Sequence, residues 1–215
     1  MMLGCNIAAL FNKKVRTMMR GHRDTWRILR RQIGTSRYVW FHAASLGEFE
    51  QGRPLMERLR REHPERKILL TFFSPSGYEV RKDYAGADVI CYLPFDTPFN
   101  AIKFVKMARP EAAYFIKYEF WRNYIDILHR NHVPVYSVSS IFRPGQIFFR
   151  WYGRNYARVL HRMTHLYVQD EASKQLLAGI GVNQVTVVGD TRFDRVIDIR
   201  LSLIHISEPT RPLYI

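Results

Sequence analysis

The chain has 215 residues, 47% of them apolar, which suits one domain or one and a half with a substantial core. Its two cysteines, Cys5 and Cys91, lie far apart in dissimilar contexts, so they indicate no disulfide framework or metal site and favour a reducing compartment. No apolar run reaches the roughly 18 residues of a membrane span, and Met1–Phe11 does not resemble a signal peptide. The net charge of +14 points to an anionic partner.

Most of the excess positive charge lies at the N-terminus. Residues 1–37 carry nine Lys and Arg side chains against Asp24 alone and so contribute +8. Leu10–Arg31 is predicted to be helical, with a loose apolar stripe between arginines, and Gly34 with its polar neighbours ends it. We expect this basic amphipathic arm to lie on anionic lipid, where each cation near the surface contributes about 1 kcal/mol. Nucleic acid would also attract this basic segment. A solvated helix face without any partner would have the same charge pattern.

From Tyr38 onward, strand-like and helix-like stretches alternate. Seven short, continuously apolar runs rich in β-branched and aromatic residues are typical of strands covered on both faces. They are Tyr38–Ala43, Lys67–Phe73, Asp88–Leu93, Ala112–Ile116, Val133–Val138, Thr164–Val168 and Gln184–Val188. The longer helical stretches between them are Glu48–Glu62, Phe99–Ala108, Trp121–Asn131, Gln146–His161 and Glu171–Ala178. Repeated β-α units predict an α/β fold with a mostly parallel, Rossmann-like sheet flanked by helices and right-handed crossovers.

Two helix starts are marked by a capping residue followed by proline. Ser74 precedes Pro75, and Asp96 or Thr97 precedes Pro98. We expect Asp96 to cap a helix rather than bind a ligand.

Familiar nucleotide and metal motifs are missing from the sequence. No G-x-G-x-x-G follows the first predicted strand and no G-x-x-x-x-G-K-[ST] occurs, so a dinucleotide or P-loop site is unsupported. The eight histidines form no ligand pattern beside acids; His161 and His165 lie among arginines and are expected at the surface. We expect no metal centre and no cofactor.

A small-residue turn follows the first predicted strand. Ala44-Ser45-Leu46-Gly47 precedes Glu48, which opens an amphipathic helix. Such turns lie at the carboxyl ends of strands, where open α/β sheets bind ligands. Gly47 is expected to let the backbone turn tightly and approach a ligand. Glu48 either offers a carboxylate to that crevice or merely complements the helix dipole, and the helix N-terminus is expected to favour its ionised form.

The stretch WFHAASLGE, from Trp40 to Glu48, resembles the N-terminal signature of the Kdo transferases. These inverting glycosyltransferases move 3-deoxy-D-manno-octulosonic acid (Kdo) from CMP-Kdo onto a lipid A precursor. Five further segments resemble family motifs in the same order: SPSG (74–77), YLPFD (92–96), EFWRN (119–123), VQDE (168–171) and GDTRFD (189–194). The resemblance runs from about Tyr38 to Arg195. It implies the Rossmann-like N-terminal domain of a two-domain GT-B glycosyltransferase, which holds the acceptor while the second domain holds the nucleotide donor.

The resemblance also implies roles for particular residues. Glu48 stands where the family has its catalytic base. Residues expected to bind the acceptor are Ser45, Gly47, Ser74, Ser76, Gly77, Lys117 and Glu119. Lys117 replaces a family glutamate and Arg122 a family proline, which suggests positive charge near a phosphorylated acceptor. Glu119 has an alternative role of equal weight, as a helix cap or as an ion-pair partner of Arg122 or Arg130.

Two further sets of arginines are candidates for contacts with negative charge. Arg192, in the last matching motif, is expected to meet the donor at the interdomain cleft. Phe142–Arg162 interleaves aromatic residues with arginines, and Arg150, Arg154 and Arg158 are spaced four apart, which places them on one helical face. Such a helix suits a lipid interface or phosphates. A solvated arginine stripe over an aromatic core, or RNA binding, remains an alternative.

The C-terminal tail does not resemble the family. Residues 201–211 resemble translated sequencing-adapter read-through, so we interpret residues 201–215 as a non-native tail. The expected organisation is then a basic membrane-associated arm (1–37), a Rossmann-like acceptor-binding domain (38–200) and a missing C-terminal donor domain. Such a fragment is expected to be inactive alone.

The expected function is therefore Kdo transfer in lipopolysaccharide core biosynthesis, at the cytoplasmic face of the inner membrane, with peripheral or N-terminal anchoring. The expected partners are a lipid A precursor, CMP-Kdo through the missing domain, and an anionic membrane surface, without nucleic acid. The alternatives are another GT-B transferase acting on a lipid-linked sugar, or a basic nucleic-acid-binding Rossmann-like module. Saturable binding of lipid A precursor versus RNA, with the salt dependence of each, separates them.

Overall fold

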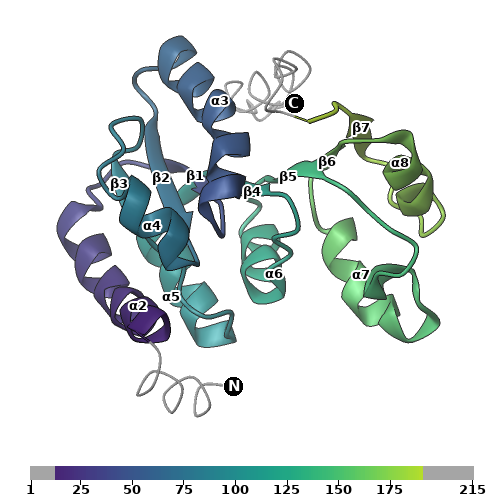
Figure 1. The fold of residues 1–215 in the computed structure, drawn as a ribbon, viewed down its shortest axis with the longest axis horizontal. Helices are drawn as coiled ribbons and strands as arrows, with labels where there is room; N and C mark the ends of the chain where they lie inside the picture. Colours follow the sequence, from purple (N-terminus) through teal and green to yellow (C-terminus); the bar gives the residue numbers. More distant parts are fainter. Residues whose placement is uncertain (1–12, 191–215) are drawn as a thin grey trace, which may run out of the picture.

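Seven parallel strands form the centre of the molecule in a computed structural model, which describes residues 13–190. Their spatial order is β3-β2-β1-β4-β5-β6-β7 (Figure 1). The strands are β1 (Tyr38–His42), β2 (Lys67–Phe72), β3 (Val89–Tyr92), β4 (Pro110–Ile116), β5 (Val135–Ser140), β6 (His165–Val168) and β7 (Val185–Val187). The predicted α/β fold with a Rossmann-like parallel sheet is confirmed, and each predicted strand is present within a few residues of its expected ends.

Helices connect the strands and cover the sheet. They are α2 (Lys13–Gln32), α3 (Leu46–Glu62), α4 (Pro75–Arg81), α5 (Pro98–Ala108), α6 (Arg122–Arg130), α7 (Arg154–His161) and α8 (Glu171–Ala178). Thr97 caps α5, since its hydroxyl accepts from the Asn100 backbone N–H at 3.2 Å, and Pro98 follows it in the first turn. Ser74 caps α4 in the same way. The capping signals in the sequence therefore mark real helix starts.

Alternation along the strands builds two cores, one on each face of the sheet. Trp40 packs into the larger cluster, together with residues from α2, α5, α6, α7 and α8. Its neighbour Phe41 packs into the second cluster, together with residues from α3. Both side chains are almost fully buried, as expected for a parallel strand covered on both faces.

The chain changes direction across the sheet between β1 and β4. From β1 it moves outward to β2 and β3, then returns to β4 on the other side of β1 and continues to β7. This is a topological switch point, where the loops after two neighbouring strands diverge. The carboxyl ends of β1 and β4 therefore border the crevice in which open α/β folds bind ligands.

The basic helix α2 packs along β3 and against α4 and α5. Leu29 is fully buried on its inner face, and the Thr25 hydroxyl donates to the Tyr92 carbonyl at 2.8 Å. Gly21 approaches the same tyrosine so closely that a Cβ would lie 2.2 Å from its ring. The outer face carries six exposed arginines: Arg16, Arg20, Arg23, Arg27, Arg30 and Arg31. Among the described residues, no helix is both long and apolar enough to span a membrane.

The predicted helix over Gln146–His161 is wrong in its first half. Two 3₁₀ turns, Ile147–Phe149 and Trp151–Gly153, precede α7. Gly153 lies against the Ile147 carbonyl, where a Cβ would sit 1.7 Å from the oxygen, so the chain folds back on itself at this point. Arg150 therefore lies in an extended link between the two turns and does not share a helical face with the arginines of α7.

Candidate active site

Three loops meet at the carboxyl edge of the sheet beside the switch point. Residues 43–45 follow β1, residues 73–74 follow β2, and residues 117–121 follow β4. The first two are joined by the backbone, because the N–H groups of Phe73 and Ser74 both donate to the Ala44 carbonyl. The predicted acceptor-binding residues therefore gather at one edge, as the sequence suggested.

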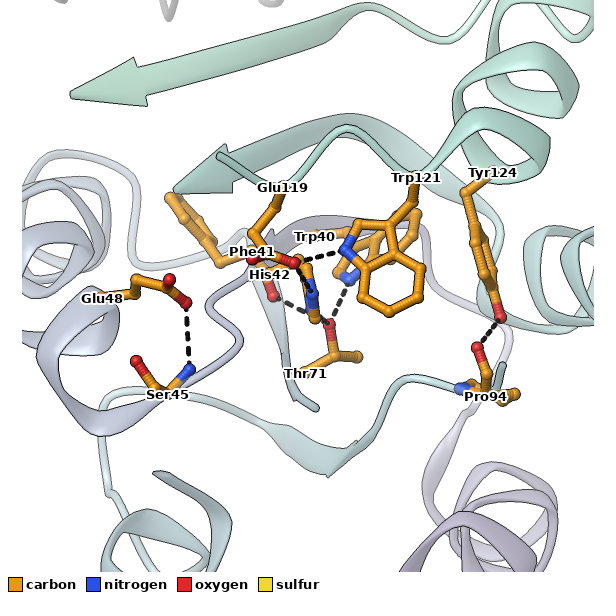
Figure 2. A network of polar contacts seen from close by, with 10 residues as sticks. All are labelled: Trp40, Phe41, His42, Ser45, Glu48, Thr71, Pro94, Glu119, Trp121 and Tyr124. Atoms are coloured by element: carbon orange, nitrogen blue, oxygen red, sulfur yellow. Dashed lines mark hydrogen bonds and ion pairs between the residues drawn. The ribbon is translucent and has the colours of Figure 1, made fainter. Parts of the chain in front are cut away.

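Glu48 is the third residue of α3 and faces this edge (Figure 2). Ser45, the N-cap, donates its backbone N–H to the Glu48 carboxylate at 3.0 Å. This contact fixes the side chain at the helix start, so the capping role and a role in chemistry are compatible. Glu48 is half-buried, in the first turn of α3 at the carboxyl edge of the sheet.

The expected ionised state of Glu48 is corrected by the structure. Burial, with a smaller contribution from the nearby charge of Glu119, raises the pKa of its carboxyl to about 7. Backbone N–H groups of Ser45 and Ala44 and the charge of Lys117 oppose this rise without cancelling it. The loss of hydration therefore raises the pKa of Glu48 more than the helix dipole lowers it. A carboxylate with a pKa near 7 is a stronger base at neutral pH than an ordinary glutamate.

Two glycines at the edge have different roles from those expected. Gly47 has no unusual backbone conformation, and a Cβ there would meet no atom within 4 Å, so the tight turn does not require glycine. It is exposed and directly precedes Glu48. Gly77 is buried, and a Cβ would lie 2.3 Å from the Phe72 ring and 3.1 Å from the Ser45 backbone. Gly77 thus allows α4 to pack against the first loop instead of presenting its backbone to a ligand.

The two serines after β2 bond to each other. Ser74 and Ser76 have their hydroxyl oxygens 3.0 Å apart, and the Ser76 backbone N–H donates to the Ser74 hydroxyl at 3.3 Å. Ser76 is exposed and can still offer its hydroxyl to a ligand, whereas Ser74 serves mainly as the helix cap.

Lys117 follows β4 with a left-handed backbone, φ 63°. Its N–H donates to the Val138 carbonyl at 2.8 Å, and its carbonyl accepts from the Ser140 hydroxyl at 2.6 Å. Ser139, at the end of β5, also has a positive φ of 61°. Non-glycine residues adopt this conformation at a cost, and such strain concentrates at functional sites. The charge of Lys117 reaches Glu48, whose pKa it lowers.

Glu119 bonds to a histidine and a tryptophan, not to the arginines considered from the sequence. Its carboxylate lies 3.2 Å from Nε2 of His42 and accepts from the indole N–H of Trp121. No ion pair of Glu119 with Arg122 or Arg130 occurs within the described part of the chain. Its side chain is 14% exposed and lies between β1 and the start of α6.

His42 and Thr71 are site residues that the sequence argument missed. Both are fully buried at the carboxyl ends of β1 and β2, with Nδ1 of His42 2.9 Å from the Thr71 hydroxyl. The sequence did contain a signal for His42, namely a polar residue at the end of an apolar strand. A buried imidazole requires hydrogen-bond partners for both of its nitrogens, so such a residue indicates a polar site. Which partners it finds depends on strand order, which the sequence does not specify.

Asp96 caps a helix, as expected, but a different one. Its carboxylate accepts the backbone N–H groups of Asn123 and Tyr124 in the first turn of α6, each at 3.3 Å. The Tyr124 hydroxyl in turn donates to the Pro94 carbonyl at 2.8 Å. These hydrogen bonds join the YLPFD and EFWRN segments, which are separated in sequence. They position the start of α6 next to Trp121 and Glu119.

The three arginines near α7 surround one groove, although they do not form a helical stripe. Arg150, Arg154 and Arg158 line a hollow of about 620 Å³ together with His161. The neighbouring aromatics Trp151, Tyr152 and Tyr156 are exposed. Arg162, the fourth of the series, forms an ion pair with Asp126 instead. Arg192 lies outside the described residues.

Metal-binding groups are scarce in the described part of the chain. Residues 13–190 contain no cluster of three His, Cys, Asp or Glu side chains suited to a metal ion. Cys91 is buried as a free thiol.

Comparison with known proteins identifies relatives of this chain. A profile of the family described as 3-deoxy-D-manno-octulosonic-acid transferase (kdotransferase) matches residues 17–195. The 3-deoxy-D-manno-octulosonic acid transferase of Haemophilus influenzae is 27% identical over 165 residues, covering 73% of this chain and 38% of the relative. The protein of the same name from Aquifex aeolicus is 39% identical over 88 residues, covering 40% and 24%. The chain thus spans less than half the length of these relatives.

Solved structures share the fold. The UDP-GlcNAc 2-epimerase of Methanocaldococcus jannaschii matches with a TM-score of 0.55 at 13% identity, over 80% of this chain and 54% of that one. The UDP-GlcNAc 2-epimerase of Neisseria meningitidis, bound to UDP-GlcNAc, matches with a TM-score of 0.54 at 15% identity, over 79% and 51%. Likeness at this level of identity concerns architecture, here the Rossmann-like half of a GT-B arrangement, and not activity.

Proposed function

The chain belongs to the 3-deoxy-D-manno-octulosonic-acid transferase family, and on that basis we propose that it is the acceptor-binding half of an enzyme that transfers Kdo from CMP-Kdo to a lipid A precursor. Because the chain spans 38% of the Haemophilus influenzae relative, we assign CMP-Kdo binding to a second domain beyond the matched region. Residues 201–215 are proposed to be a non-native tail.

Glu48 is the proposed general base, and its position and pKa carry the proposal. In the transfer, the acceptor hydroxyl oxygen forms a bond to the anomeric carbon of Kdo while the bond from that carbon to the CMP phosphate breaks. The electron pair leaves with CMP, and the proton of the hydroxyl passes to the Glu48 carboxylate. A base with a pKa near 7 is matched to this step at cellular pH. The donor brings its own leaving group, so the proposed step requires no metal or cofactor.

Acceptor binding is proposed for the groups that border Glu48. Ser45 lies on the loop after β1, Gly47 and Ser76 lie in the first turns of α3 and α4, and Lys117 and Glu119 lie after β4. Lys117 brings a positive charge to the same crevice and suits a phosphate of the acceptor. Arg192, outside the described residues, is proposed to contact the donor.

Membrane contact is proposed for the groove lined by Arg150, Arg154 and Arg158. Arginines beside exposed aromatic rings fit the interface between phosphate groups and acyl chains. The exposed arginines of α2 would add to the attraction for anionic lipid. With a lipid acceptor and a nucleotide-activated donor, the reaction is proposed to occur at the cytoplasmic face of the inner membrane.

The test is Kdo transfer by the complete reading frame that contains residues 1–200. We expect wild-type enzyme to transfer Kdo from CMP-Kdo to the lipid A precursor. Glu48→Gln, which keeps the shape of the side chain, is expected to lower kcat at least about 100-fold, the usual contribution of a positioned base. Glu50→Gln on the same helix is the matched control and should retain activity. An active Glu48→Gln enzyme would refute the role of Glu48, and inactive, folded wild type would refute the proposed reaction.

A further inference from the structure

A chain of hydrogen-bonding side chains runs beneath the crevice from β2 to the loop after β4 (Figure 2). The Trp40 indole N–H donates to the Thr71 hydroxyl at 2.8 Å. The Thr71 hydroxyl lies 2.9 Å from Nδ1 of His42, and Nε2 of His42 lies 3.2 Å from the Glu119 carboxylate. The indole N–H of Trp121 donates to that same carboxylate oxygen.

The two tryptophans fix the direction of donation along this series of hydrogen bonds. An indole N–H only donates, so the Thr71 oxygen accepts from Trp40 and has its own proton to give. Two acceptors lie within reach, the Phe41 carbonyl at 3.3 Å and Nδ1 of His42 at 2.9 Å, and the shorter contact favours the histidine. A neutral His42 then carries its proton on Nε2 and donates it to Glu119. With Trp121 as a second donor, one oxygen of Glu119 is fixed by two hydrogen bonds.

The fixed carboxylate faces the proposed base. Figure 2 shows Glu48 and Glu119 reaching into the same region, one from α3 and the other from the loop after β4. We propose that Thr71, His42 and Glu119 are positioning residues that hold a negative charge opposite Glu48 and so set how readily Glu48 takes the acceptor's proton. The inference rests on the proposed role of Glu48 as the base.

Charges around Glu48 agree with this arrangement. Repulsion by Glu119 is the largest charge effect on the Glu48 pKa and raises it, while Lys117, from the same loop, lowers it. On its own helix, Glu50 is neutralised by Arg53 and by Arg81 from the end of α4. His22, from α2, also approaches His42, but burial lowers its pKa to about 4 and leaves it neutral. Glu119 is therefore the group whose removal changes the field at Glu48 most directly.

Glu119→Gln tests the inference, because glutamine keeps the side-chain shape and an oxygen for Trp121 but removes the charge. We expect the pH at which kcat/KM reaches half its maximum to fall by about one unit, with the rate on the plateau reduced because the base is weaker. The acceptor KM, measured in the same assays, reports separately on the proposed contact of Glu119 with the acceptor. Glu50→Gln removes a charge from the same helix and is expected to leave the pH profile in place. A Glu119→Gln profile that coincides with wild type would overturn the inference.

A second measurement does not depend on Kdo transfer. Carbon-13-labelled glutamate allows the Glu48 carboxyl to be titrated by NMR in the 215-residue chain, with Glu48→Gln to assign the signal. We expect its midpoint to fall by about one unit in Glu119→Gln and also to fall in His42→Leu, which releases Glu119. His42→Gln, which retains an N–H donor, is expected to restore it partly. If the midpoint shifts but the complete enzyme transfers no Kdo, the charge of Glu119 acts on Glu48 and the proposed reaction is refuted. An unshifted midpoint would refute the inference alone.

Discussion

Glu48 shows how much one side chain depends on its surroundings. The sequence places it at a helix start, where a carboxylate is normally stabilised as an anion. In the folded chain it also loses water and faces Glu119, and both effects favour the protonated form. The sequence pattern therefore located Glu48 at a helix start but gave the wrong direction for its pKa, because burial and a neighbour 71 positions away are not local properties.

The pH dependence of transfer follows from this pKa. In its proposed role as the base, Glu48 must be ionised to accept a proton. With a pKa of about 7, kcat/KM is expected to rise roughly tenfold per unit at acidic pH and to level off above about 7. The complete enzyme, assayed at subsaturating acceptor between about pH 5 and 8.5 in buffers of constant ionic strength, gives the profile. A half-maximum near pH 4.5, the ordinary value for glutamate, would show that burial does not act on Glu48 as described.

Gly47 and Gly77 form a matched pair of substitutions. Gly77→Ala pushes a methyl group into the Phe72 ring and is expected to destabilise the chain by about 1–3 kcal/mol. Gly47→Ala meets open space on a helix and is expected to leave stability unchanged or to raise it by about 0.5 kcal/mol. Urea unfolding measures both. If Gly47→Ala nevertheless weakens acceptor binding, the acceptor approaches the backbone at this exposed position.

Among the helices, α2 is the element whose packing the sequence described least well. It was expected as an arm on lipid, and it is also part of the fold, with its inner face against β3. At its centre His22 is buried among aromatic rings, stacked on Phe95 at 4.6 Å. Neither ring nitrogen has a hydrogen-bond partner among the described residues, although backbone groups of Leu93 and Phe73 lie near enough to offset part of the lowering of its pKa.

Acid is therefore expected to loosen α2. The His22 pKa is about 4 in the folded chain, whereas an ordinary solvated histidine has 6.5, so between these values the unfolded chain binds the extra proton. The free energy of unfolding thus falls as pH decreases from 6.5 to 4, by at most about 3 kcal/mol. His22→Phe should remove most of this loss, whereas a substitution of the exposed His129 should not. Equal pH dependence of urea midpoints in wild type and His22→Phe would contradict this account.

Over the whole molecule, the sheet was predictable and its strand order was not. Buried parallel strands carry their own apolar signature, so each of the seven was located from the sequence. The contact between His42 and Glu119 spans 77 positions and exists only because β4 returns to the side of β1. Likewise, the arginine spacing predicted one continuous helix, but the close contact of Gly153 with Ile147 broke it. Local pattern determines elements, while pairing and packing determine which of their side chains meet.

Surface charge makes a prediction for the intact protein. Replacing Arg150, Arg154 and Arg158 by glutamine is expected to weaken binding to vesicles containing anionic phospholipid at least about tenfold, since each cation near the surface contributes about 1 kcal/mol. Replacing Arg61, Lys82 and Lys106, which are exposed on or beside α3, α4 and α5, removes equal charge and should have a smaller effect. Vesicle flotation at two salt concentrations measures both. Equal losses in the two triple variants would leave net charge, not the groove, as the cause.

The central position of β1 also governs how the chain can fold during synthesis. β1 leaves the ribosome before its partners, and β4, which pairs with one of its edges, follows only after β2 and β3. Until residues 110–116 emerge, that edge of an apolar strand has no partner and can pair with another chain. Parallel pairing across such separations is slow. Nascent chains of this family are therefore expected to depend on chaperones most while β4 is still untranslated, whatever the stability of the finished domain.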